Sequence, residues 1–146
     1  VLLYFQNNNI EGFKRLWSYI GSAWTNLTPF TAGGTGDPTI AANTGAGTSP
    51  TISISGKNGS HEVILTPGSS PAASASVFTV TFNNTAGSFI VTPYPVLQPS
   101  DSDAAALTGT AQVYVSSRST TTYVVSVGST PLVQSVQYRW LVHCFS

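Results

Sequence analysis

Hydrophobic and polar residues alternate with a period of two over much of this chain, most clearly from Ser76 to Asn83. One set of alternate positions in that stretch is Phe78, Val80 and Phe82, and the other is Val77, Thr79 and Thr81. Successive side chains leave a pleated strand on opposite faces. The pattern therefore predicts a β-strand whose Phe78 face lies in a core.

Segments of similar pattern follow one another from Pro50 onward. We expect strands around Ile52 and Ile54, and at His61–Thr66, Phe89–Val91, Val96–Leu97, Ala111–Ser117, Tyr123–Val127 and Val136–Cys144. The Asn58-Gly59 pair between the first two is the strongest hairpin signal in the sequence. Pro93 and Pro95 cannot donate ladder hydrogen bonds, so they predict an edge strand or a bend.

Seven or eight short strands are thus expected, with Gly, Pro, Ser and Asn between them. No intervening segment is long enough for a crossover helix, so neighbouring strands should pair antiparallel. The fold class that these features predict is all-β, an antiparallel sandwich or a barrel.

The segment from Ile10 to Leu27 fits two structures. Apolar residues three to four positions apart would form one face of an amphipathic helix: Ile10, Phe13, Trp17, Ile20 and Trp24. Leu16–Leu27 also fits two aromatic-rich strands around Gly21 and Ser22. Gly supplies turn conformations, whereas inside a helix it costs about 1 kcal/mol relative to Ala. We favour the β-hairpin.

Composition divides the chain into three segments. Residues 1–30 contain the expected hairpin and would form an attachment or shaft segment. Residues 31–49 are rich in Gly, Thr and Ala and cannot bury enough apolar surface to order themselves, so we expect a linker unless the segment lies along a partner chain. Residues 50–146 would form the sandwich head. The chain contains no Met, so we expect a processed product or a piece of a longer protein.

The charged fraction is the unusual feature of the composition. Of the 146 residues, 41% are hydrophobic but only 7% are charged, against roughly 25% in a typical soluble domain. A nearly uncharged surface lacks the repulsion that keeps monomers apart, which favours a symmetric oligomer. The five basic and five acidic residues balance to a formal net charge of zero, and the basic residues form no stripe. Without a basic stripe or a long apolar run, we expect no nucleic-acid partner and no membrane insertion.

Few residue patterns indicate catalysis or a cofactor. The glycines at 33–36 lack the preceding strand, following helix and Lys of a phosphate cradle. His61 beside Glu62, and His143 beside the single cysteine Cys144, would point to opposite faces of a strand and could not readily share a proton. We therefore expect no enzyme activity, no catalytic residue and no cofactor.

The densest charge of the expected head is the pair Asp101 and Asp103, in the irregular stretch Gln98–Thr110. A calcium site needs about six to eight oxygen ligands, and no other acid is near in the sequence, so we expect no metal. Loops of this kind commonly carry binding surfaces. We therefore take both aspartates as candidate receptor-binding residues.

Exposed aromatic residues are a second candidate for recognition, because their rings can stack on sugar rings. The aromatics considered are Trp17, Tyr19, Trp24 and Tyr94. Most aromatics of a small β domain are needed for the core or for subunit interfaces. From this group we place only Tyr94 with Asp101 and Asp103 as a candidate receptor contact.

Several motifs together resemble the C-terminal head domains of bacteriophage tail fibres and related trimeric fibre adhesins. They are Gly45–Thr48 leading to Thr51–Gly56, Pro71-Ala72-Ala73 before Val77–Phe82, and Tyr138-Arg139-Trp140. Leu16–Leu27 is similar to the Tyr-x-Gly-x-x-Trp-x-x-Leu hairpins of phage structural proteins. The likeness covers about Leu16 to Val142. Departures from it are Ile20, where Asn or Asp is more usual, and the insertion Lys57–Glu62.

The resemblance implies a parallel homotrimer of β-sandwiches on a virion surface, or on a bacterial cell surface as a fibre. It implies a non-enzymatic fibre or spike component that attaches to a host cell-surface glycan or protein, with the N-terminal segment bound to other virion structural proteins. The alternative function is an architectural capsid or tail decoration protein with no receptor. A polysaccharide-degrading spike would need paired carboxylates in a groove, and Asp101 and Asp103 are the only close pair.

Overall fold

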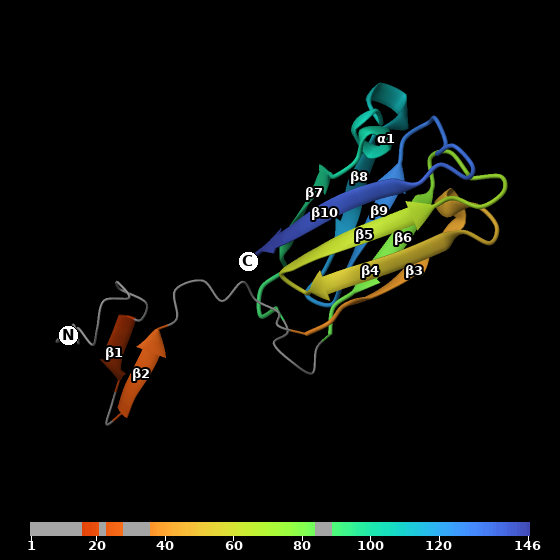
Figure 1. The fold of residues 1–146 in the computed structure, drawn as a ribbon. Helices are drawn as coiled ribbons and strands as arrows, with labels where there is room; N and C mark the ends of the chain where they lie inside the picture. Colours follow the sequence, from red (N-terminus) through yellow and green to blue (C-terminus); the bar gives the residue numbers. More distant parts are fainter. Residues whose placement is uncertain (1–15, 21–22, 28–35, 84–88) are drawn as a thin grey trace. The chain divides into compact units, whose positions relative to one another are not determined.

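The computed structural model describes residues 16–20, 23–27, 36–83 and 89–146. The chain divides into two compact units, Val1–Thr31 and Ala32–Ser146 (Figure 1). In the first unit, β1 (Leu16–Ile20) pairs antiparallel with β2 (Ala23–Leu27). The expected turn residues Gly21 and Ser22, and the side chains of Trp17, Tyr19 and Trp24, lie outside what the structure describes.

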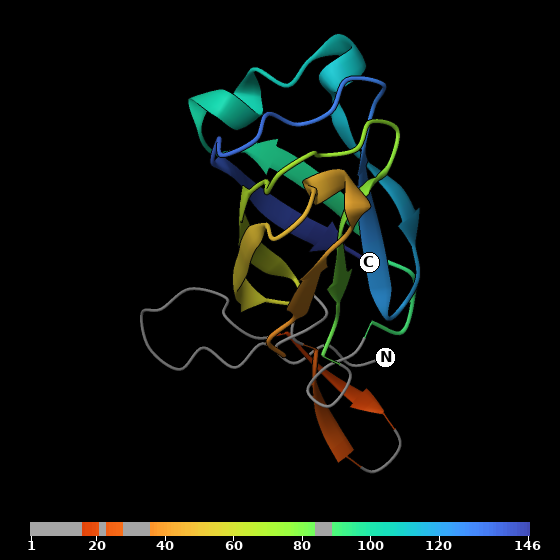
Figure 2. The same cartoon turned by 90° about the vertical axis from the view of Figure 1, so that its right-hand side faces the viewer.

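The second unit is a sandwich of two four-stranded sheets, seen as two layers in Figure 1 and Figure 2. The first sheet has the strand order β4-β5-β10-β7. Its strands are β4 (Thr51–Lys57), β5 (Ser60–Thr66), β10 (Tyr138–Phe145) and β7 (Tyr94–Pro99). All three neighbouring pairs are antiparallel, as expected.

The second sheet has the order β3-β6-β9-β8 and is also antiparallel throughout. Its strands are β3 (Thr39–Ala42), β6 (Ser76–Thr81), β9 (Thr122–Val127) and β8 (Val113–Arg118). Short helical turns connect some strands: α1 (Ser102–Ala105), η1 (Thr44–Ala46) and η2 (Gly109–Ala111). The predicted all-β class and antiparallel sandwich are confirmed, with eight strands in the described part of this unit.

The core lies between the sheets and follows the predicted alternation. Phe78 and Val80 of β6 and Tyr138, Trp140 and Val142 of β10 are buried. Phe78 meets Trp140 across the layers, with ring centroids 6.0 Å apart. The two-residue period of the central strands therefore sets which side chains fill the space between the sheets.

Three expectations about individual segments were wrong. Part of the expected linker is strand β3 and turn η1, and β3 completes the second sheet. Val77, expected opposite to the core, is buried because the pairing of β6 with β9 shifts register between Ser76 and Phe78. Residues 89–91 form no strand; instead Phe89 packs edge-on against Phe82 with ring centroids 4.7 Å apart.

Two ends of the sandwich differ in what they hold. The first, which we call the entry end, contains Gly36, the Asn58-Gly59 turn and Phe145. Two backbone hydrogen bonds join these segments: Asn58 N–H donates to the Gly36 carbonyl, and Cys144 N–H donates to the Gly59 carbonyl. The other, which we call the far end, contains η1 and α1 (Figure 1). Chain entry and the last strand therefore share one end of this unit.

Candidate functional site

The two candidate aspartates lie at the far end, at the start of α1. Asp101 is the N-cap residue, and its Oδ1 accepts a hydrogen bond of 2.7 Å from Ala104 N–H. Asp103 lies exposed in the first turn. A side-chain oxygen at this position satisfies an otherwise unpaired helix N–H. Asp101 thus has a structural role that the sequence analysis did not anticipate.

Tyr94, the third candidate residue, lies at the entry end. It begins β7 opposite Phe145, whereas Asp101 follows the other end of the same strand. The length of β7 separates them, and a strand rises about 3.3 Å per residue. The three predicted receptor-binding residues therefore do not form one site.

The Tyr94 ring contacts the Arg118 guanidinium, a cation–π contact that the sequence did not indicate. The Arg118 guanidinium carbon lies 3.7 Å from the Tyr94 ring centroid, and Arg118 Nη1 donates 3.1 Å to the Pro93 carbonyl. Arg118 ends β8, so this contact joins the edges of the two sheets. Tyr94 nevertheless remains 61% exposed.

Further exposed side chains continue this surface across β7 and β10. Phe145 is 61% exposed and lies opposite Tyr94, while Val96 is 52% exposed and lies opposite His143. The rings of His143 and Phe145 have centroids 6.4 Å apart. We call the five residues Tyr94, Val96, Arg118, His143 and Phe145 the aromatic edge. Exposed apolar side chains gathered in this way commonly mark a binding surface.

A serine and a histidine also meet beside this surface. Ser60 Oγ lies 3.3 Å from His143 Nδ1. Nucleophilic catalysis by such a pair requires a third group that orients the imidazole, usually a carboxylate. Among the residues that the structure describes, no carboxylate hydrogen bonds to His143. The pair on its own therefore gives no support for a hydrolase.

The most buried titratable pair joins the two sheets through the core. His61 Nε2 of β5 lies 2.7 Å from the Tyr123 hydroxyl of β9, and His61 Nδ1 lies 3.0 Å from the Lys57 carbonyl. A carbonyl only accepts, so Nδ1 carries the proton and the Tyr123 hydroxyl donates to Nε2. Burial lowers the pKa of His61, an effect that His143 reinforces and the Lys57 hydrogen bond opposes. Both groups are neutral and inaccessible, so we regard the pair as structural.

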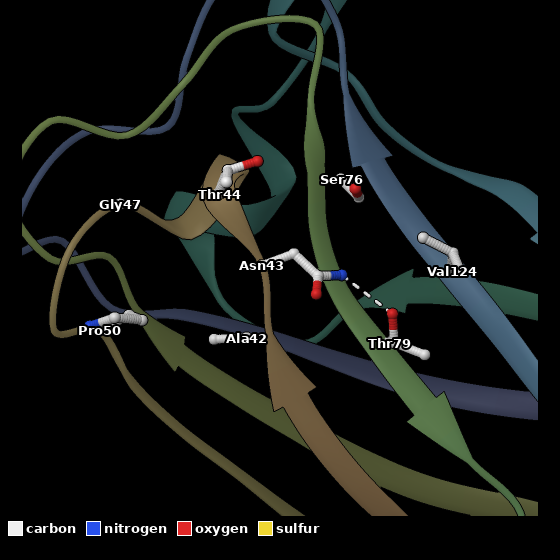
Figure 3. A pocket seen from close by; sticks show the side chains of 8 residues that line it. All are labelled: Ala42, Asn43, Thr44, Gly47, Pro50, Ser76, Thr79 and Val124. Atoms are coloured by element: carbon white, nitrogen blue, oxygen red, sulfur yellow. Dashed lines mark hydrogen bonds between the residues drawn. The ribbon is translucent and has the colours of Figure 1, made fainter.

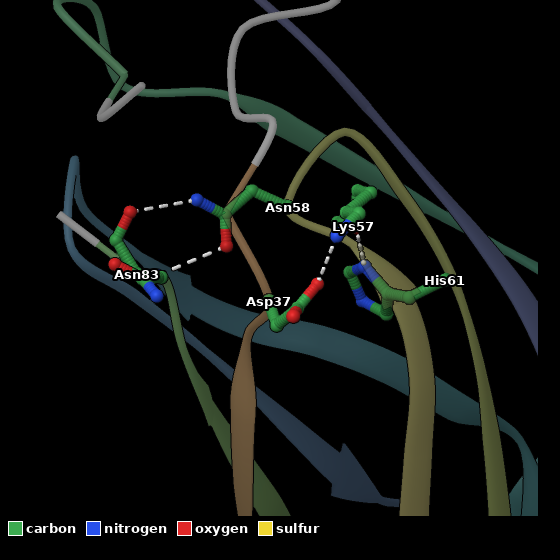
Figure 4. A network of polar contacts seen from close by, with 5 residues as sticks. All are labelled: Asp37, Lys57, Asn58, His61 and Asn83. Carbon is green, nitrogen blue, oxygen red and sulfur yellow. Dashed lines mark hydrogen bonds and ion pairs between the residues drawn. The ribbon is translucent and has the colours of Figure 1, made fainter. Parts of the chain in front are cut away.

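A network of polar contacts holds the β4–β5 turn at the entry end (Figure 4). The buried Asn58 amide donates 2.9 Å to the Asn83 carbonyl and accepts 3.0 Å from Asn83 N–H. Lys57 forms an exposed ion pair of 2.5 Å with Asp37. These contacts tie the turn to the segment that enters the unit and to the end of β6.

A hollow of about 560 Å³ lies beside η1 (Figure 3). Small and uncharged residues line it: Ala42, Asn43, Thr44, Gly47, Pro50, Ser76, Thr79 and Val124. Asn43 Nδ2 donates 2.9 Å to Thr79 Oγ1 and so uses one of the amide donors internally. Ligand sites usually add aromatic or charged groups to such a lining, and this hollow has neither.

Comparisons with protein-family models, with curated proteins and with solved structures find no match. Among the described residues, no cluster of three or more His, Cys, Asp or Glu could hold a metal ion. Within that same part of the chain, no helix has the length and apolarity needed to cross a bilayer. The aromatic edge is therefore the candidate site that the geometry supports best.

Sequence reasoning found Tyr94 but missed its partners. Arg118 is distant from Tyr94 in sequence, and only the neighbouring edges of the two sheets bring them together. Phe145 continues the outward positions of β10 after Arg139, Leu141 and His143. Extending the predicted last strand by one residue would have placed Phe145 on that outer face.

Proposed function

We propose that this chain is a non-enzymatic fibre or spike component of a virion surface that attaches to a host cell-surface glycan or protein. The observation that carries the proposal is the aromatic edge, where Tyr94 and Phe145 are each 61% exposed on a small β-sandwich. Recognition surfaces of this kind use rigid rings with one open face, because little conformational entropy is lost on binding.

The proposal includes self-association into a parallel homotrimer. Low surface charge supports it, since only 7% of residues are charged. Three linked copies would each contribute a weak site, and linked sites gain about 10²- to 10⁴-fold in avidity without new contacts. The N-terminal unit would bind other virion structural proteins.

The test has two measurements on the purified chain. Light scattering coupled to size exclusion should give the mass of three chains. Retention on immobilised bacterial surface polysaccharides and on intact cells should be weak for a monomeric form and strong for the trimer. A monomer that binds no cell surface would contradict attachment.

A second function, an architectural decoration protein, is favoured by one observation. The aromatic edge lies at the entry end, the same end of the sandwich as Gly36, rather than at the far end. A surface at the end where the chain enters is well placed to be covered by a neighbouring structural subunit. Binding of the chain to purified virion shells, with no retention on cells, would support this function over attachment.

A further inference from the structure

Four side chains of the aromatic edge lie together on the outer face of the first sheet. Tyr94 lies opposite Phe145 and Val96 lies opposite His143, so four side chains form a two-by-two array. Facing residues lie about 5 Å apart across strands and about 7 Å apart along them. An aromatic array of this size can cover one face of a sugar ring, because the ring C–H groups pack against the π face.

Arg118 adds a positive charge to this surface, and no described carboxylate pairs with it. Its only hydrogen bond within the described part of the chain goes from Nη1 to the Pro93 carbonyl, and its guanidinium is otherwise held by the Tyr94 ring. A guanidinium has five N–H donors, so most remain available. A planar cation that is already fixed in position is suited to bidentate pairing with a carboxylate.

Among the residues that the structure describes, no carboxylate forms an ion pair with Arg118. Asp37 pairs with Lys57, and Asp101 caps α1 at the far end. Glu62 lies on β5, opposite Leu141, so β10 separates it from β7. The positive charge of Arg118 is therefore left for a ligand.

The free edge of β7 is poorly suited to binding an extended peptide, because two of its residues are prolines. Pro95, Leu97 and Pro99 are alternate residues of β7, so their backbone groups face the same side of the strand. Neither proline has an N–H. β10 pairs with one side of β7 and leaves the other side free. Of Pro95, Leu97 and Pro99, only Leu97 can present an N–H on that free side, because proline has none. A peptide could not add to this edge through a continuous ladder.

We propose that the aromatic edge binds an acidic saccharide, with the sugar carboxylate on Arg118 and the sugar ring on Tyr94 and Phe145. This inference rests on the proposed attachment function and specifies its ligand class. Hydrogen bonding by the remaining Arg118 N–H groups selects the anion, and the exposed aromatic rings select a sugar ring over a flexible chain.

The test uses the full chain, labelled with ¹⁵N, and titrations with oligogalacturonate, oligoglucuronate and a sialyl oligosaccharide. Methyl-esterified oligogalacturonate is the matched neutral probe, because it keeps the sugar rings and lacks the charge. The NMR signals of Tyr94, Arg118 and Phe145 should shift with at least one acidic probe. The affinity for the ester, obtained from the same signals, should be at least tenfold lower. If none of the three acidic probes shifts these signals at millimolar concentration, the proposal is wrong.

Variants separate the contributions of charge and ring. Arg118→Gln should weaken acidic binding about tenfold, the effect of losing one charge-assisted contact worth about 1.4 kcal/mol. Phe145→Ala should weaken the binding of the acidic probes and of the neutral methyl ester by the same factor, because both stack on the ring. Arg139→Gln and Tyr114→Ala are the controls, since they remove a cation and a half-exposed ring away from the edge.

The outcomes distinguish this inference from the attachment function. If Arg118→Gln still binds acidic saccharides like the original chain, the inference fails, although retention on cells would leave attachment standing. If Arg118→Gln instead changes the solution mass, the edge is an interface between copies and the inference also fails. Unfolding midpoints of the variants should lie close to that of the original chain, because Arg118, Tyr114 and Phe145 are exposed. Arg139 is half-buried, but among the described residues it bonds through its side chain only to the exposed Gln137.

Discussion

Burial changes the chemistry of three titratable side chains in the core. His61 and Tyr123 are neutral and bonded to one another, and burial raises the pKa of Tyr123 well above its usual value, with Cys144 adding to the effect. Burial also raises the pKa of the Cys144 thiol to about 12. These groups therefore act as packing and hydrogen-bonding elements at neutral pH.

Removing the Tyr123 hydroxyl should destabilise the sandwich. Tyr123→Phe leaves His61 Nε2 buried without its donor, which costs about 1–3 kcal/mol. Urea denaturation measures the free energy of unfolding. Tyr114→Phe is the control and should change it by less than about 0.5 kcal/mol, because Tyr114 is 48% exposed. Equal effects at the two tyrosines would show that the pair contributes little.

Stability should fall as the pH is lowered from neutral, because His61 resists protonation only in the folded state. Its folded pKa is lowered by burial, so below about 6.5 the unfolded chain binds a proton that the folded chain does not. The free energy of unfolding should drop by up to about 1.4 kcal/mol per pH unit until the folded pKa is reached. In His61→Gln this component should be missing from urea titrations at pH 5 to 7.

Cys144 should be unreactive in the native protein. It is 3% exposed and mostly protonated at pH 8 because its pKa is raised. Mass spectrometry after treatment with iodoacetamide should find the native chain unmodified and the chain in urea fully alkylated. Rapid labelling without denaturant would mean that the last strand opens readily.

At the scale of single elements, the β4–β5 hairpin has a backbone feature that its turn sequence does not suggest. Asn58 and Gly59 form the two-residue turn, yet the left-handed φ of +122° belongs to Gly56 in the strand before it. A Cβ on Gly56 would lie 2.6 Å from the Ser60 carbonyl oxygen. The turn therefore depends on a glycine outside the familiar Asn-Gly pair.

Gly56→Ala should therefore lower stability by about 1–3 kcal/mol through strain and steric conflict. Gly109→Ala is a matched control, because Gly109 also has a positive φ, +58°, but a Cβ there would meet no atom within 4 Å. The difference between the two unfolding free energies measures the cost of the Gly56 backbone conformation and the conflict with Ser60 beyond that of an ordinary left-handed residue. No difference would show that the hairpin relaxes to admit the methyl group.

The sequence predicts regular elements better than it predicts the pairing of strands. Alternation was sufficient for the cores of β6 and β10, since Phe78 and Trp140 lie where the two-residue period places them. It failed at Val77, because a register shift changes which side chains turn inward without leaving a mark in the pattern. It also failed for β3, whose Thr-Ile-Ala-Ala segment is too short and too weakly apolar to indicate a strand without its partner β6.

The candidate site shows the same limit. Tyr94 was proposed because aromatic rings can stack on sugar rings, but the Arg118 contact exists only because the edges of the two sheets meet. Asp101 and Asp103 were chosen for their charge density, and the structure gives Asp101 a capping bond instead. Local patterns report single side chains, whereas a site depends on contacts between distant strands.

At the scale of the whole molecule, the unit Ala32–Ser146 should need β3 for its stability. A fragment of residues 36–146 should unfold cooperatively like the intact chain. A fragment of residues 50–146 lacks β3 and the packing of Ile40, whose burial contributes up to about 3 kcal/mol, and leaves β6 as an open edge. Thermal unfolding followed by circular dichroism should give a lower midpoint for the shorter fragment, and equal midpoints would restore the linker interpretation of residues 36–49.

Gly36 and Phe145 lie at the same end of the sandwich, which has a practical consequence. A β-unit whose two chain ends emerge at the same end can be grafted into a surface loop of an unrelated carrier protein without stretching either connection. The far-end loops would then point away from the carrier. Peptide epitopes inserted after Gly109, where space is open, would be presented to solvent on a rigid support.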